Sequence, residues 1–290
     1  MNHRYRGVEQ RYISVENASI RIVVSDTKQA LSRSGLPDLD YALNPYLGCA
    51  HRCVYCYARR YFEDLYRGNV VVVRSSIHRV LANEVRYVSR GVVGVGTVTD
   101  PYQPIEADLE LTRRCLEILI ERSRLSVSIQ TKSSLVLRDL DLLAMARGRV
   151  DVGFTITSLD QRMKIFEPYA PPPKERVRAL EKLASEGVKT WIFYGPVIPG
   201  INDDDDTIRS LVELAQETNS VLYYDKLHIK PFMEHVPMLR NVVEEVRRYP
   251  WRKLFEFIEE MCRRYGVVCR PGFIGDAVEK PRRTLDQYIR

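Results

Sequence analysis

The chain has 290 residues, of which 45% are hydrophobic and 28% are charged, and its formal net charge is +6 at pH 7. This composition is that of an ordinary globular protein, and it excludes a disordered chain, a collagen and a coiled coil. The length suits one large α/β domain or two small domains, and the modest positive charge permits an acidic partner such as nucleic acid without requiring one.

The first 39 residues form a polar segment. Residues 1–12 carry several arginines and lack the apolar core of a targeting sequence. Elsewhere, no stretch reaches the roughly 18 consecutive apolar residues that a membrane span requires. We therefore expect a cytoplasmic protein with no membrane span, and we interpret residues 1–39 as an arm that packs on the domain that follows.

A cysteine-rich segment comes next. Cys49, Cys53 and Cys56 fall within eight positions of one another. Thiolates this close repel one another unless a positive charge lies among them, and an odd number cannot be consumed by internal disulfides, so we expect a metal ion or a cluster. A structural zinc site needs four ligands, usually with the second pair on a distant part of the chain. His51 could supply a fourth ligand, but it lies inside the same loop, where its reach to the same ion would be strained. An iron–sulfur cluster held by three cysteines keeps one iron open, which suits a catalytic site.

The rest of the chain alternates between β-branched runs and amphipathic stretches. Helical patterns at 57–66 and 77–90 precede the alternation, and two more follow residue 232. The order strand, loop, helix then predicts parallel strands joined by right-handed helical crossovers. The predicted strands are 92–98, 126–131, 150–157, 188–194 and 221–229, and the helices between them are 109–124, 137–146, 173–187 and 206–217.

Polar side chains follow four of these strands. Because the carboxyl ends of parallel strands meet at one edge of a sheet, these residues are expected to lie around one site. The alternative is that they are helix caps and turns. The residues that carry this expectation are Thr97, Thr99 and Asp100, then Thr131 and Lys132, then Thr157 and Ser158, and finally the segment 195–202 with Val197.

The cysteine spacing resembles a known signature. The pattern Cys-x-x-x-Cys-x-aromatic-Cys, with Tyr55 at the aromatic position, is similar to that of radical S-adenosylmethionine (SAM) enzymes. Within that superfamily, residues 28–231 resemble the spore photoproduct lyase-like or DNA repair photolyase branch. The resemblance implies an α/β fold, a partial (β/α)6 TIM-like barrel formed by residues 40–232, with residues 1–39 as an arm and 233–290 as a helical extension. The stretches that carry the branch resemblance are 44–58, 96–106, 131–143, 155–160 and 196–203.

The same resemblance implies a set of cofactors and roles. Cys49, Cys53 and Cys56 would hold a [4Fe-4S] cluster whose open iron chelates the amino and carboxylate groups of SAM. An electron from a donor such as ferredoxin or flavodoxin would then give a 5'-deoxyadenosyl radical. The implied SAM contacts are Tyr55 and Val197 through their backbone to adenine, Thr97, Thr99 and Asp100 to the amino group, Lys132 to the carboxylate or ribose, and Thr157 and Ser158 to the ribose.

One departure from the branch affects the expected product. Spore photoproduct lyase is expected to carry a hydrogen-donating cysteine on the strand that here ends in Thr97, and no cysteine lies between Cys56 and Cys115. Tyr102 and Tyr57 are then candidate donors. We interpret Cys115 as a core residue. The remaining two cysteines, Cys262 and Cys269, are expected to be buried or joined in a disulfide.

Three functions stay open on the sequence. The first is a radical SAM enzyme that acts on a nucleobase or nucleic acid in a lyase-like or DNA repair reaction, on a base that is flipped out if it comes from a duplex. The second keeps the radical chemistry but acts on a small molecule, a lipid or a peptide. The third is a non-catalytic iron–sulfur or zinc module that binds nucleic acid.

Overall fold

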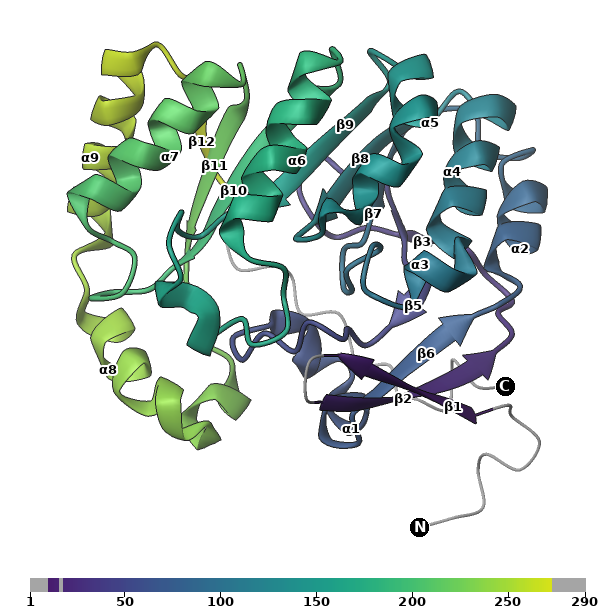
Figure 1. The fold of residues 1–290 in the computed structure, drawn as a ribbon, viewed down its shortest axis with the longest axis horizontal. Coiled ribbons are helices and arrows are strands. Elements are labelled where there is room, and N and C mark those ends of the chain that lie inside the picture. Colours follow the sequence, from purple (N-terminus) through teal and green to yellow (C-terminus); the bar gives the residue numbers. More distant parts are fainter. Residues whose placement is uncertain (1–9, 16–17, 273–290) are drawn as a thin grey trace.

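The computed structural model describes residues 10–15 and 18–272, and its centre is an eight-stranded sheet (Figure 1). The strand order is β12-β11-β10-β9-β8-β7-β4-β3, and every neighbouring pair is parallel except β3 with β4. Seven consecutive parallel strands, β4 and β7 to β12, confirm the predicted α/β architecture. The strands are β3 (Leu31–Arg33), β4 (Tyr41–Leu43), β7 (Val92–Val95), β8 (Ser126–Thr131), β9 (Val150–Thr155), β10 (Lys189–Val197), β11 (Val221–Lys226) and β12 (Cys269–Pro271).

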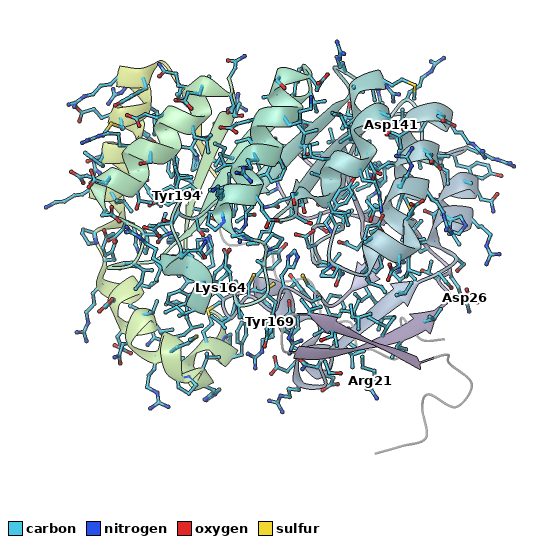
Figure 2. The ribbon with its side chains drawn as sticks, in the orientation of Figure 1. Arg21, Asp26, Asp141, Lys164, Tyr169 and Tyr194 are labelled. Carbon is cyan, nitrogen blue, oxygen red and sulfur yellow. A yellow bond between two sulfur atoms is a disulfide. The ribbon has the colours of Figure 1, made fainter. Side chains whose placement is uncertain are left out.

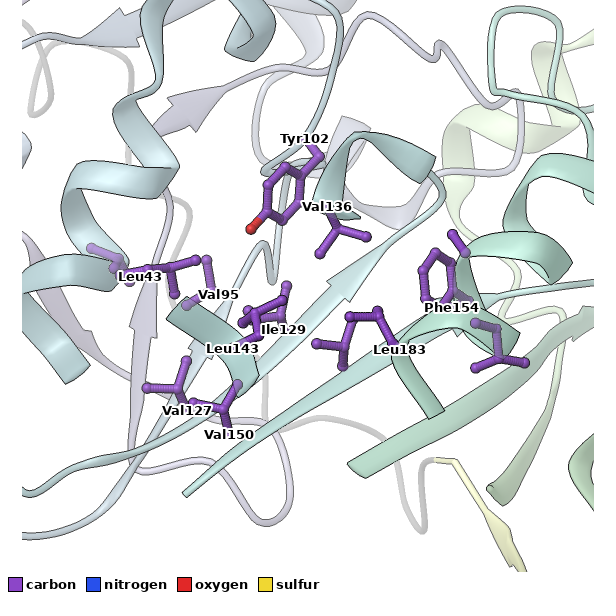
Figure 3. Packing of buried hydrophobic residues seen from close by; sticks show 14 of the residues in the cluster. Leu43, Val95, Tyr102, Val127, Ile129, Val136, Leu143, Val150, Phe154 and Leu183 are labelled. Carbon is purple, nitrogen blue, oxygen red and sulfur yellow. The ribbon is translucent and has the colours of Figure 1, made fainter. Parts of the chain in front are cut away.

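Helices cover one face of this sheet, as Figure 1 shows for α4 to α7. Strand side chains alternate between faces, so every second residue meets the helices. Val127, Ile129, Val152 and Phe154 point to this side and are at most 1% exposed, in the core that Figure 3 shows. Burial of each such side chain contributes about 1.5–3 kcal/mol. The crossover helices are α2 (Ile77–Glu84), α4 (Leu111–Arg122), α5 (Leu140–Met145), α6 (Pro173–Ser185) and α7 (Asp205–Glu217).

Several predicted boundaries were wrong. The strand expected to reach residue 98 ends at Val95, because Gly96 turns the chain with a φ of +86°. A Cβ at Gly96 would lie 2.4 Å from Pro101 Cδ, so only glycine fits this turn. The strands predicted to end at 157 and 229 stop at 155 and 226, and the one predicted to end at 194 continues to 197. The predicted helix 137–146 is a 3-10 helix, η2 (Ser134–Asp139), followed by α5.

A second, four-stranded sheet lies below the main one in Figure 1. Within the predicted arm, β1 (Gln10–Val15) and β2 (Ala18–Ser25) form an antiparallel pair, and β2 continues in parallel with β6 (Val70–Arg74). The sheet ends with β5 (Tyr46–Leu47). The pattern analysis missed β6, because its four valines are all buried and show no alternation.

The carboxyl-terminal part continues the main sheet. The helices α8 (Arg240–Arg248) and α9 (Trp251–Tyr265) follow two short 3-10 turns, η4 (Pro231–His235) and η5 (Pro237–Leu239), and lead to β12 beside β11. Cys262 on α9 and Cys269 on β12 form a disulfide, one of the two predicted states. Residues 273–290, which include the basic tail, lie outside the described residues, and the division into arm, barrel and extension stays a prediction.

Two further expectations are settled by burial and length. Cys115 on α4 is 0% exposed inside the main core, as its helical spacing predicted. Within residues 10–15 and 18–272, no helix is long and apolar enough to cross a membrane.

Candidate functional site

The cysteine loop, residues 48–56, lies at the carboxyl ends of the main-sheet strands, between β5 and η1 (Tyr57–Arg60). The segment after β7 binds one end of the loop: Thr99 Oγ1 donates to the carbonyl of Gly48 at 2.6 Å, and the N–H of Ala50 donates to Gln103 Oε1 at 2.9 Å. Gly48 has a φ of +77°, and a Cβ there would lie 2.6 Å from a backbone oxygen of β6. The loop therefore needs glycine where it enters the site.

The segment after β9 binds the other end of the loop. The N–H of Val54 donates to the carbonyl of Phe166 at 2.9 Å, and the N–H of Tyr169 donates to the carbonyl of His51 at 3.3 Å. Figure 2 places Tyr169 below the strand ends, at the level of the loop. This segment contains the 3-10 helix η3 (Arg162–Ile165). Two loops far apart in the sequence thus hold the three cysteines in place.

Two of the three thiols, those of Cys49 and Cys53, lie in a setting that disfavours thiolates unless a cation joins them. Burial, then Asp100 and the neighbouring cysteines, raise the pKa of the Cys49 thiol well above its usual value. Burial raises the pKa of the Cys53 thiol to about 12, although the charge of Lys132 opposes this. The Tyr66 hydroxyl, on α1 (Glu63–Arg67), donates to Cys56 Sγ at 3.1 Å. Iron would supply the missing positive charge.

The number of cysteines in the loop suits a cluster in which three thiolates leave one iron open. Across residues 10–15 and 18–272, no group of three His, Cys, Asp or Glu side chains is arranged to hold one metal ion. Thiolates around one zinc ion, at Zn–S distances near 2.3 Å, lie within roughly 4 Å of one another. In a four-iron cluster each thiolate bonds a different iron, so the ligands stand further apart. The residues present are therefore compatible with the predicted [4Fe-4S] group.

Asp100 connects the cysteine loop to the ends of two strands. Its Oδ2 lies 3.3 Å from His51 Nδ1 and accepts the N–H of Lys132 at 2.7 Å, while its Oδ1 accepts the Thr131 hydroxyl at 2.7 Å and the N–H of Tyr102 at 2.9 Å. Burial alone would raise the pKa of Asp100, but His51 and these hydrogen bonds lower it to about 2. Asp100 is thus an ionised carboxylate already committed to four protein groups, and its predicted contact with the SAM amino group stays a prediction.

A buried ion pair lies directly beside the loop, and the sequence analysis did not find it. Glu167 and Arg176, both 3% exposed, are 2.5 Å apart. Glu167 accepts the hydroxyls of Tyr55 and Thr157, the latter at 3.3 Å. The Lys132 ammonium lies 5.8 Å from the centre of the Tyr55 ring. Three predicted residues, Tyr55, Lys132 and Thr157, are therefore brought together around one carboxylate.

The remaining predicted residues make contacts of a different kind. Thr97 accepts a hydrogen bond from Asn44 Nδ2 at 3.0 Å, and its carbonyl accepts the Tyr57 hydroxyl. Ser158 donates to Asp160 in a turn, at 3.0 Å. The carbonyl of Val197 accepts the N–H of Leu227 at 3.2 Å. These residues line the same edge of the sheet, but their hydrogen bonds shape backbone turns.

Asn202 is the last residue of the predicted segment 195–202, and the sequence analysis assigned it no role of its own. It is fully buried, donates to the carbonyl of Thr157 at 2.8 Å and accepts the N–H of Ile198 at 2.7 Å, so it joins the ends of β9 and β10. Tyr102, a candidate hydrogen donor, is fully buried and donates to Asp139 at 3.0 Å. Its hydroxyl is thus engaged in the core, and its role as a hydrogen donor stays a prediction.

Comparisons with known proteins agree with this geometry. Residues 43–212 match the model of the Radical SAM superfamily. An uncharacterized protein of Methanocaldococcus jannaschii is 32% identical over 222 residues, which cover 75% of this chain and 82% of that protein.

Solved structures share the fold. A spore photoproduct lyase mutant with bound AdoMet and dinucleoside spore photoproduct superposes with a TM-score of 0.63 at 17% identity, over 88% of this chain and 82% of that chain. A radical SAM methyltransferase from Sphaerobacter thermophilus gives a TM-score of 0.52 at 16% identity, over 91% of this chain and 76% of that chain. At such identities the likeness is one of fold.

Proposed function

Because this chain belongs to the radical SAM superfamily, we propose that Cys49, Cys53 and Cys56 hold its [4Fe-4S] cluster at the mouth of the barrel. Enzymes of this superfamily use a [4Fe-4S] cluster and SAM and need a reductant, for which we propose a ferredoxin or a flavodoxin. When bound, the cluster and SAM together supply a 5'-deoxyadenosyl radical. The observation that carries the proposal is the docking of one cysteine loop on the segments after β7 and β9.

The chain's own residues bind and orient the cofactor in this proposal. The Lys132 ammonium suits the carboxylate of SAM, because its pKa is raised and it stays a cation. Burial lowers this pKa, but the charges of Cys53 and Glu167 raise it by more. Asp100 and Glu167 act as positioning residues, since each fixes a part of the cysteine loop through His51 or Tyr55. The proposed SAM-contacting residues are Tyr55, Thr97, Thr99, Asp100, Lys132, Thr157, Ser158 and Val197.

The substrate that we propose is a nucleobase, free or within nucleic acid, in a lyase-like or repair-like reaction. The fold shared with a lyase that was solved with a dinucleoside photoproduct supports this substrate class, and the net charge of +6 permits it. A base in a duplex must be flipped out of the stack to reach the barrel. Thr97 stands at the predicted position of the donor cysteine, and a threonine hydroxyl is a poor hydrogen-atom donor. We therefore propose a reaction other than spore photoproduct repair.

The test is anaerobic reconstitution with iron and sulfide, followed by dithionite and SAM. We compare wild type, Cys53→Ala and the matched core variant Cys115→Ala, measuring iron content, the electron paramagnetic resonance signal of the reduced cluster, and 5'-deoxyadenosine by chromatography. Wild type and Cys115→Ala should hold a cluster and form 5'-deoxyadenosine, and Cys53→Ala should do neither. A Cys53→Ala protein that retains both, or a fully loaded wild type that forms no product, would contradict the proposal.

A further inference from the structure

The two faces of the main sheet differ in chemistry. The face under the helices is buried and mainly aliphatic, with Phe154, Tyr194 and Tyr224 as its aromatic members. On the opposite face, here called the inner face, most side chains are polar or aromatic and half-buried, with a glycine and a valine among them. Barrel interiors that serve only as cores are filled by layers of branched aliphatic side chains, so this composition indicates a face that meets a ligand. The inner face comprises Ser128, Gln130, Asp151, Gly153, Trp191, Phe193, Val221 and Tyr223.

Trp191 is the fixed centre of the inner face. It pairs with Gly153 on the neighbouring strand, and a Cβ at that glycine would lie 2.0 Å from the indole Cε2. One face of the indole therefore lies flat on the β9 backbone. The indole Nε1 donates to Asp151 Oδ1 at 2.7 Å, and Asp151 also accepts the Ser128 hydroxyl at 2.6 Å. The Tyr223 ring meets the indole edge-on at 5.5 Å and 78°.

These contacts leave the second face of the indole pointing away from the sheet. Trp191 is half-buried, and its first face and its Nε1 edge are covered, which leaves the second face and the edge of the six-membered ring for its exposed area. An aromatic ring held rigid on several sides loses little freedom when a planar group stacks on it. The indole is thus a preformed stacking platform.

The platform lies inside the barrel, on the side of the proposed SAM site. Thr155 follows Gly153 by two residues at the end of β9, and Thr157, two residues beyond the end of the strand, contacts the Glu167 carboxylate. At about 3.3 Å per residue, Gly153 lies roughly 7 Å from Thr155, on the way to that carboxylate. Gln130 occupies the next strand in the same row and donates to Thr155 Oγ1 at 3.2 Å.

We propose that the inner face binds a nucleobase, which stacks on the free face of Trp191. This inference rests on the proposed function, because it assigns the substrate of that same site. A base has the planar π surface that stacks on an aromatic ring, and its edge carries the donors and acceptors that Gln130 and neighbouring polar groups match. Such stacking reads no sequence, so the face suits a single-stranded or flipped-out base of any type.

The chain offers a matched experiment, because it has two tryptophans. Trp251, whose Nε1 donates to the carbonyl of Val246, lies on α9 and serves as the control. We titrate reconstituted Trp251→Phe and Trp191→Phe with a short single-stranded DNA oligonucleotide and follow tryptophan fluorescence. The signal of Trp191 should be quenched to saturation, and that of Trp251 should not change. In addition, Trp191→Leu should weaken oligonucleotide binding roughly 5- to 100-fold, and Trp251→Leu should leave it unchanged.

Two results would overturn the inference. One is oligonucleotide binding without quenching of the Trp191 fluorescence. This result is expected if another part of the chain covers the indole, so that no base can stack on it. The other is equal affinity of wild type and Trp191→Leu. Cluster content and 5'-deoxyadenosine formation are measured on the same samples. If the oligonucleotide does not bind while 5'-deoxyadenosine still forms, the substrate assignment fails and the radical chemistry stands. Absence of 5'-deoxyadenosine from fully loaded wild type defeats the proposed function itself.

Discussion

The substitution Arg176→Gln removes the cation from the buried pair beside the cysteine loop. Arg176 donates to Glu167 at 2.5 Å and to the carbonyls of Thr155 and Pro171 at 3.0 and 2.8 Å. With both charged side chains 3% exposed, the variant leaves the Glu167 carboxylate buried without its partner. Breaking a buried pair in this way costs about 3–5 kcal/mol, a large share of the 5–15 kcal/mol that stabilises a typical domain.

The double variant Glu167→Gln/Arg176→Gln separates the ion pair from its hydrogen bonds. The two positions then carry no charge, so the loss falls to that of neutral hydrogen bonds, about 1 kcal/mol each. We therefore expect the double variant to be more stable than Arg176→Gln alone. In a double-mutant cycle this appears as a coupling energy of a few kcal/mol between the two positions.

The assay is urea unfolding of the anaerobically reconstituted protein, followed by circular dichroism. Lys182→Gln is the matched control, because its ion pair with Glu186 is exposed on the surface of α6, and we expect no measurable change of the urea midpoint. The reasoning is refuted if Arg176→Gln lies within about 1 kcal/mol of wild type, or if the double variant loses the sum of the two single losses.

Three further changes test other parts of the fold. Gly96→Ala should cost about 2–5 kcal/mol, since strain at its positive φ adds to overpacking, whereas Gly148→Ala, with φ +88° and nothing within 4 Å, should cost about 1–2 kcal/mol in urea unfolding. Burial raises the pKa of Asp151, so the folded state binds its proton more tightly and wild type loses stability as pH rises above about 4. Asp151→Asn lacks that loss, and its Tm relative to wild type should rise from pH 4 to pH 7. Replacement of Cys262 and Cys269 by serine should cost about 2–3 kcal/mol in urea unfolding, the loop entropy of a bridge across seven positions.

Each of these expectations has a clear counter-result. Equal losses for the two glycine variants would show that the Gly96 turn relaxes freely. A Tm difference that is flat with pH, or falls toward pH 7, would mean that Asp151 is not held above its ordinary pKa. Six thiols titrating in the denatured, unreduced wild-type protein would show that Cys262 and Cys269 are not bridged.

Local patterns were enough to predict the architecture and the cysteine loop. The period-two and helical spacings identified five of the seven consecutive parallel strands, because each depends on residues only a few positions apart. The spacing of Cys49, Cys53 and Cys56 is likewise local, and so is the series of polar strand ends. The strand β6 was not predicted, because a run of buried valines shows no alternation of apolar and polar residues. The predicted strand ends were wrong where a turn, such as that at Gly96, ends the strand.

Only the tertiary structure decided which of these residues meet. Glu167 and Arg176 lie on different elements, and nothing in their spacing distinguishes them from surface charges until burial removes their water. Asp100 holds the cysteine loop through His51, because the ends of two strands bring the carboxylate next to that loop. The indole of Trp191 became a platform because parallel pairing sets it opposite Gly153. The sequence by itself determined the strands β7 to β11, most of the helices between them and the cysteine loop, since local periodicity and spacing specify them. Contacts across strands depend instead on the register that packing selects.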